Sequence, residues 1–185
     1  MGPHKLQAET LIRPATLDDA VGLADLGALV FRHTYGAAIP PTVLDVYLAR
    51  TFTPAALGQA LQNGETSYWV ATQADRLIGY SKCAITAPPT AVQGANAAEL
   101  VNLYVHPAYQ GCGIGRQLLQ QAIQVAAAQH LTTLWLCVWQ ANQRAIDFYQ
   151  RYGFAIVGKT EVYVDDVVFE DWIMQRAIIH ATAGQ

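Results

Sequence analysis

Short stretches of β-branched and aromatic residues alternate along the chain with segments whose apolar residues recur at helical spacing. Gly, Pro, Asn or Asp bounds most of the strand-like stretches. The helix-like segments carry apolar residues on one face and polar residues on the other. This alternation predicts an α/β protein in which helices cover one sheet. Strands are expected at residues 10–13, 67–72, 77–85, 99–105, 132–138, 154–157, 160–164 and 168–174.

Helix starts are marked by capping hydroxyls. Thr16 precedes two acidic residues, and Thr53 precedes Pro54, which suits the first helical position. Helices are expected at residues 16–30, 42–50, 53–61, 116–129 and 141–152. The link between the first two contains several polar aromatic residues and is either a hinge or part of an acceptor site. The acceptor-binding candidates in this link are Phe31, His33 and Tyr35.

Three glycines at alternating positions lie between the strand at 99–105 and the helix that follows. They are Gly111, Gly113 and Gly115. Glycine allows positive φ and lacks the Cβ that would hold a ligand away. The free N–H groups and the dipole at a helix start favour an anion such as pyrophosphate, and Arg116 adds a positive charge. The alternative is that these glycines only make a tight connection.

Two familiar phosphate-binding loops fit this stretch badly. A P-loop needs Lys and then Ser or Thr, whereas Arg116 and Gln117 follow Gly115. A dinucleotide-binding fingerprint needs its third glycine one position later, an early strand and an acidic residue about 20 residues further on. The glycine loop therefore belongs to neither class.

Composition and charge restrict the class of protein. The chain has 185 residues, of which 52% are hydrophobic, and this is enough for one core and short for two. We expect one domain over residues 10–177, with tails at 1–9 and 178–185. A net charge of −3 gives no general attraction to nucleic acid or to an acidic membrane. Without an apolar run of about 18 residues or an apolar signal core, we expect a cytoplasmic protein.

The cysteines and the other residues that commonly bind metals do not have the spacing of a disulfide framework or of a metal site. Cys83, Cys112 and Cys137 are widely spaced and odd in number, which favours neither a disulfide framework nor a zinc site. No group of His, Cys, Asp or Glu has the spacing of metal ligands, and no Ser-His-Asp order is credible. We expect no metal.

The glycine loop resembles the acyl-CoA signature of the GNAT superfamily of N-acetyltransferases. That signature reads Gln or Arg, two residues, Gly, any residue, and Gly or Ala, and it is filled by Gln110, Gly113 and Gly115. The flanking residues 103–107 and 115–119 are also similar to that superfamily.

A second stretch resembles the later half of the same fold. Valine and tryptophan end a strand and are followed by Asn142, Ala145, Phe148, Tyr149, Gly153 and Phe154. The resemblance extends from residue 12 to 177. It implies the acyl-CoA N-acyltransferase fold: a mixed, mostly antiparallel sheet of about seven strands, with a splayed parallel central pair and four to five flanking helices.

The resemblance implies acetyl-CoA as co-substrate. Its pantetheine arm would lie between the two central strands, bonded to the backbone of Leu103, Tyr104 and Val105, and Asn142 would contact it. The pyrophosphate would be held by the amides of Gln110, Gly111, Cys112, Gly113, Ile114, Gly115 and Arg116.

The implied reaction is direct attack of an amine on a thioester. It needs a neutral amine and a proton for the departing thiolate. Tyr149 stands where family members carry the general acid, and the alternative for it is packing under the helix. Glu99, at the start of the binding strand, is the candidate base, directly or through water. The alternative for Glu99 is a solvated carboxylate.

Several segments resemble more specifically the PaiA-type polyamine acetyltransferases. They are residues 31–36, 53–54, 99–105, 135–139 and 171–174. This resemblance implies a small primary amine, a polyamine, as acceptor. A protein N-terminus, an amino acid or an antibiotic amine are the alternative acceptors, and a sensor that binds acyl-CoA without turnover is the alternative class. Relatives frequently pair through their C-terminal strands, so the resemblance also allows a homodimer.

Overall fold

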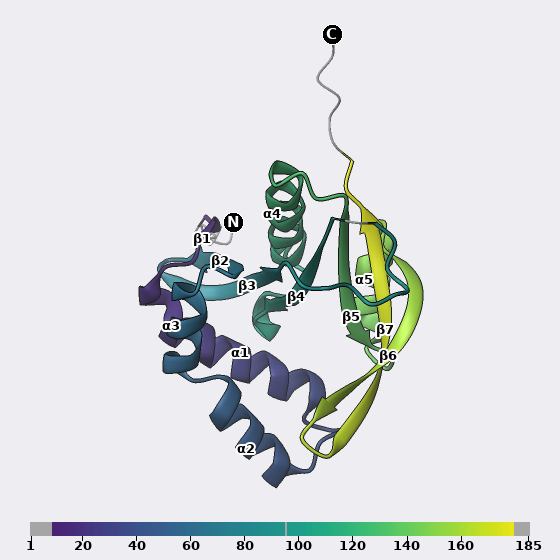
Figure 1. Cartoon of the computed structure of the whole chain (residues 1–185). Coiled ribbons are helices and arrows are strands. Elements are labelled where there is room, and N and C mark those ends of the chain that lie inside the picture. Colours follow the sequence, from purple (N-terminus) through teal and green to yellow (C-terminus); the bar gives the residue numbers. More distant parts are fainter. Residues whose placement is uncertain (1–8, 95, 180–185) are drawn as a thin grey trace, which may run out of the picture.

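A computed structural model describes residues 9–94 and 96–179 (Figure 1). These residues form a seven-stranded sheet in the order β1-β2-β3-β4-β5-β7-β6. The strands are β1 (Leu11–Pro14), β2 (Thr66–Gln73), β3 (Arg76–Ala84), β4 (Ala97–Val105), β5 (Thr133–Trp139), β6 (Ala155–Val164) and β7 (Val167–Ala177). The α-helices are α1 (Ala20–Tyr35), α2 (Pro41–Thr51), α3 (Pro54–Gln62), α4 (Ile114–Ala128) and α5 (Gln143–Arg151).

The two central strands separate soon after they meet. β4 and β5 pair in parallel only over Ala97 to Glu99, opposite Thr133 to Trp135. Beyond these pairs the strands diverge toward α1 (Figure 1). Every other pairing in the sheet is antiparallel, and β4 stays paired with β3 as far as Val105. One edge of β4 therefore has no neighbouring strand from Leu100 onward, and the predicted splayed pair is confirmed.

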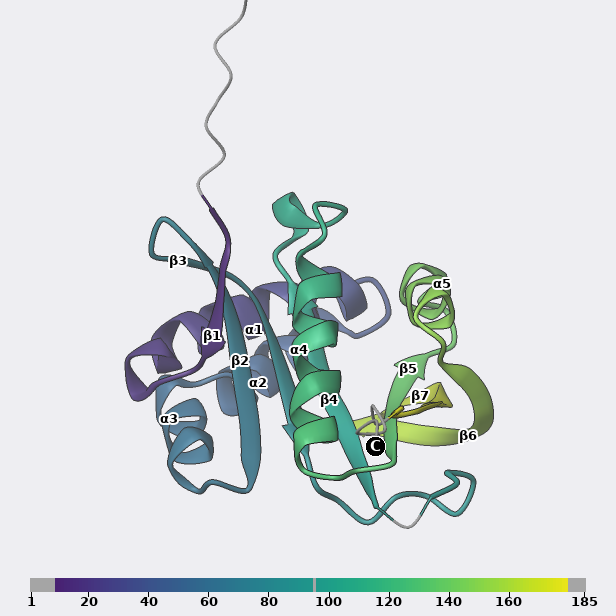
Figure 2. The same cartoon turned by 90° about the horizontal axis from the view of Figure 1, so that it is seen from above.

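The helices cover both faces of the sheet. α1 and α3 pack against β2 and β3 on one face, whereas α4 and α5 lie on the other (Figure 2). Adjacent leucines of α4 serve different parts of the core. Leu118 packs with Ala71 and Ile78, while Leu119 packs in the core that includes residues of β4, β5 and β7. Helix α4 thus joins the two halves of the sheet where the central strands separate.

The first helix lies further along the chain than the sequence predicts: residues 17–19 form a 3-10 turn, and α1 begins at Ala20 rather than at Thr16. Residues 31–35, expected in a link, form the last turns of α1, and Gly36 follows as its C-cap. Phe31 and Tyr35 stand one turn apart with ring centroids 4.5 Å apart, and Phe31 also stacks on Tyr47 of α2 at 4.8 Å. These ring contacts stabilise the additional helical turns, because aromatic side chains four residues apart lie on one helix face.

Several other boundaries also differ from the prediction. β4 begins at Ala97 inside the expected loop, α4 begins at Ile114 inside the glycine stretch, and β6 is one continuous strand across residues 155–164. Of the predicted tail at residues 1–9, residues 1–8 lie outside the described residues. In the predicted C-terminal tail, Ile178 is buried and its N–H donates to the carbonyl of Thr132.

Candidate active site

A cavity of about 690 Å³ lies where β4 and β5 separate. Its walls come from β4, the glycine loop, the end of β5, α5 and the end of α1. Residues on these walls include Tyr35, Leu103, Tyr104, Val105, Gln110, Gly113, Gly115, Arg116, Cys137, Trp139, Asn142, Arg144 and Tyr149. The structure therefore brings together most of the residues predicted to hold the cofactor. Cys112 and Ile114 lie in the same loop but do not line the cavity.

The glycine loop has the backbone that only glycine adopts without strain. Gly111 and Gly113 have φ angles of 83° and 84°. A Cβ built on either would meet no heavy atom within 4 Å, so open space lies above the loop. Gly113 is the N-cap of α4, and the unpaired N–H groups of the first helical turn follow it. Both the open space and the helix dipole favour an anionic group here.

Two hydrogen bonds connect the glycine loop to its surroundings. The side-chain Nε2 of Gln110 donates to the carbonyl of Val105 at 3.1 Å, and Arg144 of α5 donates to Gln110 Oε1 at 2.6 Å. The second bond spans the cavity wall between the loop and α5. Sequence reasoning missed Arg144. Its only signal was an arginine in the first turn of the helix that follows Asn142.

Asn142 has a structural role that its sequence position did not reveal. It is the N-cap of α5, and its Oδ1 accepts a hydrogen bond from the N–H of Ala145 at 3.2 Å. It also lines the cavity. The cap fixes where α5 begins, and hence where Tyr149 lies.

Tyr149 projects from α5 into the cavity. Its ring packs against Phe148 and Phe154, with centroid distances of 5.3 and 5.5 Å. Burial raises the pKa of the phenol well above its usual value, with smaller contributions from Tyr35 and Cys83. The hydroxyl is enclosed by protein and is still reached from the cavity. It stays protonated at neutral pH, as a proton donor must.

Glu99 lies at the point where the central strands separate. It pairs with Trp135 in the last parallel register, one residue before the cavity wall begins at Leu100. Thr86 Oγ1 donates to its Oε2 at 3.0 Å. Its carboxylate opposes the lowering of the Lys82 pKa, which is caused mainly by burial. Glu99 is therefore beside the cavity rather than on its surface, which suits a base that acts through water.

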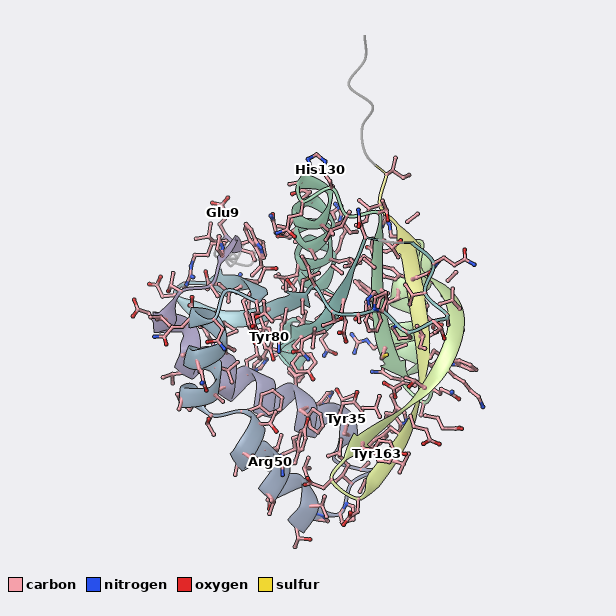
Figure 3. The ribbon with its side chains drawn as sticks, in the orientation of Figure 1. Glu9, Tyr35, Arg50, Tyr80, His130 and Tyr163 are labelled. Carbon is pink, nitrogen blue, oxygen red and sulfur yellow. The ribbon has the colours of Figure 1, made fainter. Side chains whose placement is uncertain are left out.

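The three acceptor candidates of α1 have different surroundings. Both His33, which is exposed, and Tyr35, which is partly buried, line the cavity. Phe31 is 6% exposed and lies in the core between α1 and α2. Tyr35 contacts the rings of Trp139 and Phe169 at 5.5 and 5.3 Å, and in Figure 3 it lies near the β6–β7 hairpin. Of the three candidates, Tyr35 and His33 therefore face the cavity, whereas Phe31 packs behind Tyr35.

The sequence model of the Acetyltransferase (GNAT) family matches residues 36–154, which include the glycine loop, the separated strands and α5. The chain belongs to this family. Acetyltransferases of the family act with acetyl-CoA, and the acetyltransferase described here uses it as co-substrate.

Similar proteins agree with this assignment. An uncharacterized N-acetyltransferase of Mycobacterium tuberculosis is 30% identical over 162 residues, which are 84% of this chain and 98% of that protein. A ribosomal protein bS18-alanine N-acetyltransferase of Haemophilus ducreyi is 30% identical over 114 residues, 60% of this chain and 73% of that protein. The structure of the PaiA N-acetyltransferase of Thermoplasma acidophilum in complex with coenzyme A has a TM-score of 0.75 at 22% identity, covering 91% and 99% of the two chains. This last likeness supports the fold.

The described residues offer neither a metal site nor a membrane-spanning helix. Within 9–94 and 96–179 no three His, Cys, Asp or Glu side chains could hold a metal ion together. No helix in these ranges has the length and apolar character needed to cross a membrane.

Proposed function

We propose that the acetyltransferase transfers the acetyl group of acetyl-CoA to a primary amine of a polyamine, by direct attack in a ternary complex. The observation that carries the proposal is the division of charge around the cavity. Arg116 and Arg144 line the cavity beside the glycine loop. Tyr35 and Trp139 line another part of its wall, and Glu99 lies beside the cavity where β4 and β5 separate. The arginines suit a phosphate-bearing cofactor. Aromatic rings and a carboxylate suit the ammonium groups of a polyamine.

In this proposal the cofactor extends along the free edge of β4. The backbone of Leu103, Tyr104 and Val105 binds the pantetheine arm as a neighbouring strand would, and Asn142 lies beside the arm. The pyrophosphate accepts hydrogen bonds from the amides of residues 110–116. The Gln110 side chain, which bonds the Val105 carbonyl, holds the loop against the end of β4.

Each reaction step has an assigned group. The acceptor ammonium loses a proton to Glu99, directly or through a water molecule. The neutral amine then attacks the thioester carbonyl, so that a C–N bond forms while the C–S bond breaks. Tyr149 donates its proton to the departing thiolate. The acylated nitrogen loses its second proton, which restores the Tyr149 hydroxyl directly or through water, and Glu99 returns the first proton to solvent. The products are an N-acetyl amine, CoA thiol and one released proton.

Replacing Glu99 by Gln is expected to lower kcat/KM for the amine about tenfold at neutral pH. The loss is moderate because Glu99 is only partly buried, so that water can replace part of its function. The pH at which kcat/KM falls on the acidic side of the profile should also shift, because Gln cannot be protonated in place of Glu99. Steady-state kinetics across the pH range measures both effects.

The matched control is Glu65→Gln, which removes the same charge from an exposed carboxylate away from the cavity. Its pH profile should equal that of the wild type. If Glu99→Gln also leaves the profile unaltered, Glu99 is not the base.

The acceptor is tested by the release of CoA thiol from acetyl-CoA. The panel contains spermidine, spermine, amino acids, aminoglycosides and short peptides with N-terminal alanine. We expect turnover with the polyamines and little with the rest. If only another class of amine in the panel is acetylated, that class and not a polyamine is the acceptor. Tight acetyl-CoA binding without turnover of any amine would favour a sensor that binds acyl-CoA.

The second candidate acceptor is a protein N-terminus. The observation that favours it is the 30% identity to the bS18-alanine N-acetyltransferase, and the alanine peptides in the panel test it.

We also propose that the enzyme is cytoplasmic, which agrees with the three free cysteines in the described residues.

We further propose a homodimer that pairs through the hairpin of the C-terminal strands β6 and β7. The apolar side chains exposed on this hairpin, Ile156, Val162, Tyr163 and Val168, are consistent with such pairing.

A further inference from the structure

One buried carboxylate of β7 has no counterion in the structure. Asp171 is 6% exposed, and its Oδ1 has no hydrogen-bond partner among the described residues. The ion pairs of residues 9–94 and 96–179 all use other carboxylates. A buried carboxylate without a partner costs folding free energy, so its presence calls for a ligand that supplies the missing charge.

Asp171 adjoins three residues that line the cavity. It is the cross-strand neighbour of Trp139 on β5, and both side chains lie on the face of the sheet that α1 covers. The carboxylate contributes to the raised pKa values of Tyr35 on α1 and Cys137 on β5, after the larger effect of burial. It is therefore close to both. Asp171 does not itself line the cavity, and it lies behind the part of the wall formed by Tyr35, Cys137 and Trp139.

Asp171 and Glu99 lie on either side of the Cys137 thiol. Both carboxylates add to the raised pKa of that thiol, which reaches about 11 mainly through burial. Along β5, Glu99 is opposite Trp135 and Asp171 is opposite Trp139. Four residues of strand separate these positions by about 13 Å. The acceptor side of the cavity therefore has a carboxylate near each end.

We propose that Asp171, with the rings of Tyr35 and Trp139, forms a subsite for a second ammonium group of the acceptor, the one that is not acetylated. This subsite rests on the proposed function, since it requires an acceptor with at least two amines. While Glu99 serves the reacting nitrogen, Asp171 binds the distal charge. The aromatic faces add a cation–π attraction. The enzyme then discriminates polyamines from monoamines by charge at both ends of the cavity.

The proposal is tested by titrating spermidine into CoA-saturated protein in a calorimeter. Asp171→Asn should weaken binding about tenfold or more, because a hydrogen bond to a charged group is lost. The control Glu170→Gln removes an equal charge from the neighbouring, exposed position and should bind like the wild type. In turnover, Asp171→Asn should raise the KM for 1,8-diaminooctane, whose amines are far enough apart to approach both carboxylates, and leave that for n-octylamine unchanged, since n-octylamine lacks only the second amine.

Thermal unfolding separates this role from a structural one. Because burial raises the folded-state pKa of Asp171 from 3.8 to about 6, its charge destabilises the folded state above pH 6, and the penalty vanishes as pH falls to about 4. The groups that face it are the Tyr35 hydroxyl, the Cys137 thiol and the Thr160 hydroxyl, all neutral in this range. Asp171→Asn should therefore melt at a higher temperature than the wild type at pH 8 and at a similar one at pH 4.

The outcomes distinguish this inference from the proposed function. If wild-type protein turns over spermidine and Asp171→Asn binds it equally well, only the subsite is wrong. A lower melting temperature of Asp171→Asn at pH 8 would likewise overturn the subsite, because it assigns Asp171 a structural role. If the wild type neither binds nor acetylates any polyamine, both proposals fail.

Discussion

Replacing Tyr149 by Phe is expected to lower kcat about 10²- to 10³-fold while leaving the affinity for acetyl-CoA nearly intact. The change removes one hydroxyl and keeps the ring that packs against Phe148 and Phe154. Since the hydroxyl is enclosed, water cannot easily supply the proton in its place. Single-turnover kinetics measures the chemical step, and a CoA titration measures the affinity.

The raised pKa of the Tyr149 phenol is compatible with proton donation to sulfur. The neighbouring Cys83 thiol has a pKa raised to about 12, mainly by burial. A CoA thiolate that forms beside Tyr149 would lose its hydration in the same way, and its basicity would rise with that of the phenolate. The pKa values of the Tyr149 phenol and of the CoA thiol then differ less than they do in water, so the proton transfer from Tyr149 to the thiolate is less unfavourable.

Tyr152→Phe is the matched control. Tyr152 lies one turn after Tyr149 in the chain, also lines the cavity and contacts Phe148 at 4.8 Å between ring centroids. The same loss of a hydroxyl there should leave kcat within about twofold of the wild type. If Tyr149→Phe turns over like Tyr152→Phe, Tyr149 has no part in the mechanism.

The local parts of the site could be predicted from the sequence. The glycine loop could be recognised because positive φ, the absence of Cβ and a following amphipathic helix are all properties of neighbouring residues. The splayed strands, by contrast, were inferred from the resemblance. No local pattern shows that β4 and β5 pair over only three residues before they separate.

Contacts between distant residues could not be predicted. Arg144 and Gln110 are 34 positions apart, and their hydrogen bond depends on how α5 packs beside the loop. Asp171 is one of several acidic residues near the C-terminus, and the sequence alone does not distinguish it from the others. Only the pairing of β5 with β7 places it beside Trp139 and Cys137 and leaves it without a counterion. The last turns of α1 were missed because they are stabilised by rings from α2 as well as by their own sequence.

Replacing Gly113 by Val is expected to weaken CoA binding more than 100-fold. Valine is disfavoured at a φ of 84° by about 1–3 kcal/mol, so the loop would relax toward another conformation and turn its amides away from the pyrophosphate. Even without relaxation, the side chain would occupy the open space above the loop, where no heavy atom lies within 4 Å of the position that a Cβ would take. Either response removes the anion site.

A control with the same strain is available in the chain. Gly64 has a φ of 67°, and a Cβ there also meets no heavy atom within 4 Å, but Gly64 lies in the turn between α3 and β2, away from the cavity. Gly64→Val should therefore lose a similar amount of thermal stability and bind CoA like the wild type. Calorimetric titration of both variants, at a temperature where both are folded, separates strain from loss of the site. Normal CoA affinity in Gly113→Val would mean that the pyrophosphate does not lie on this loop.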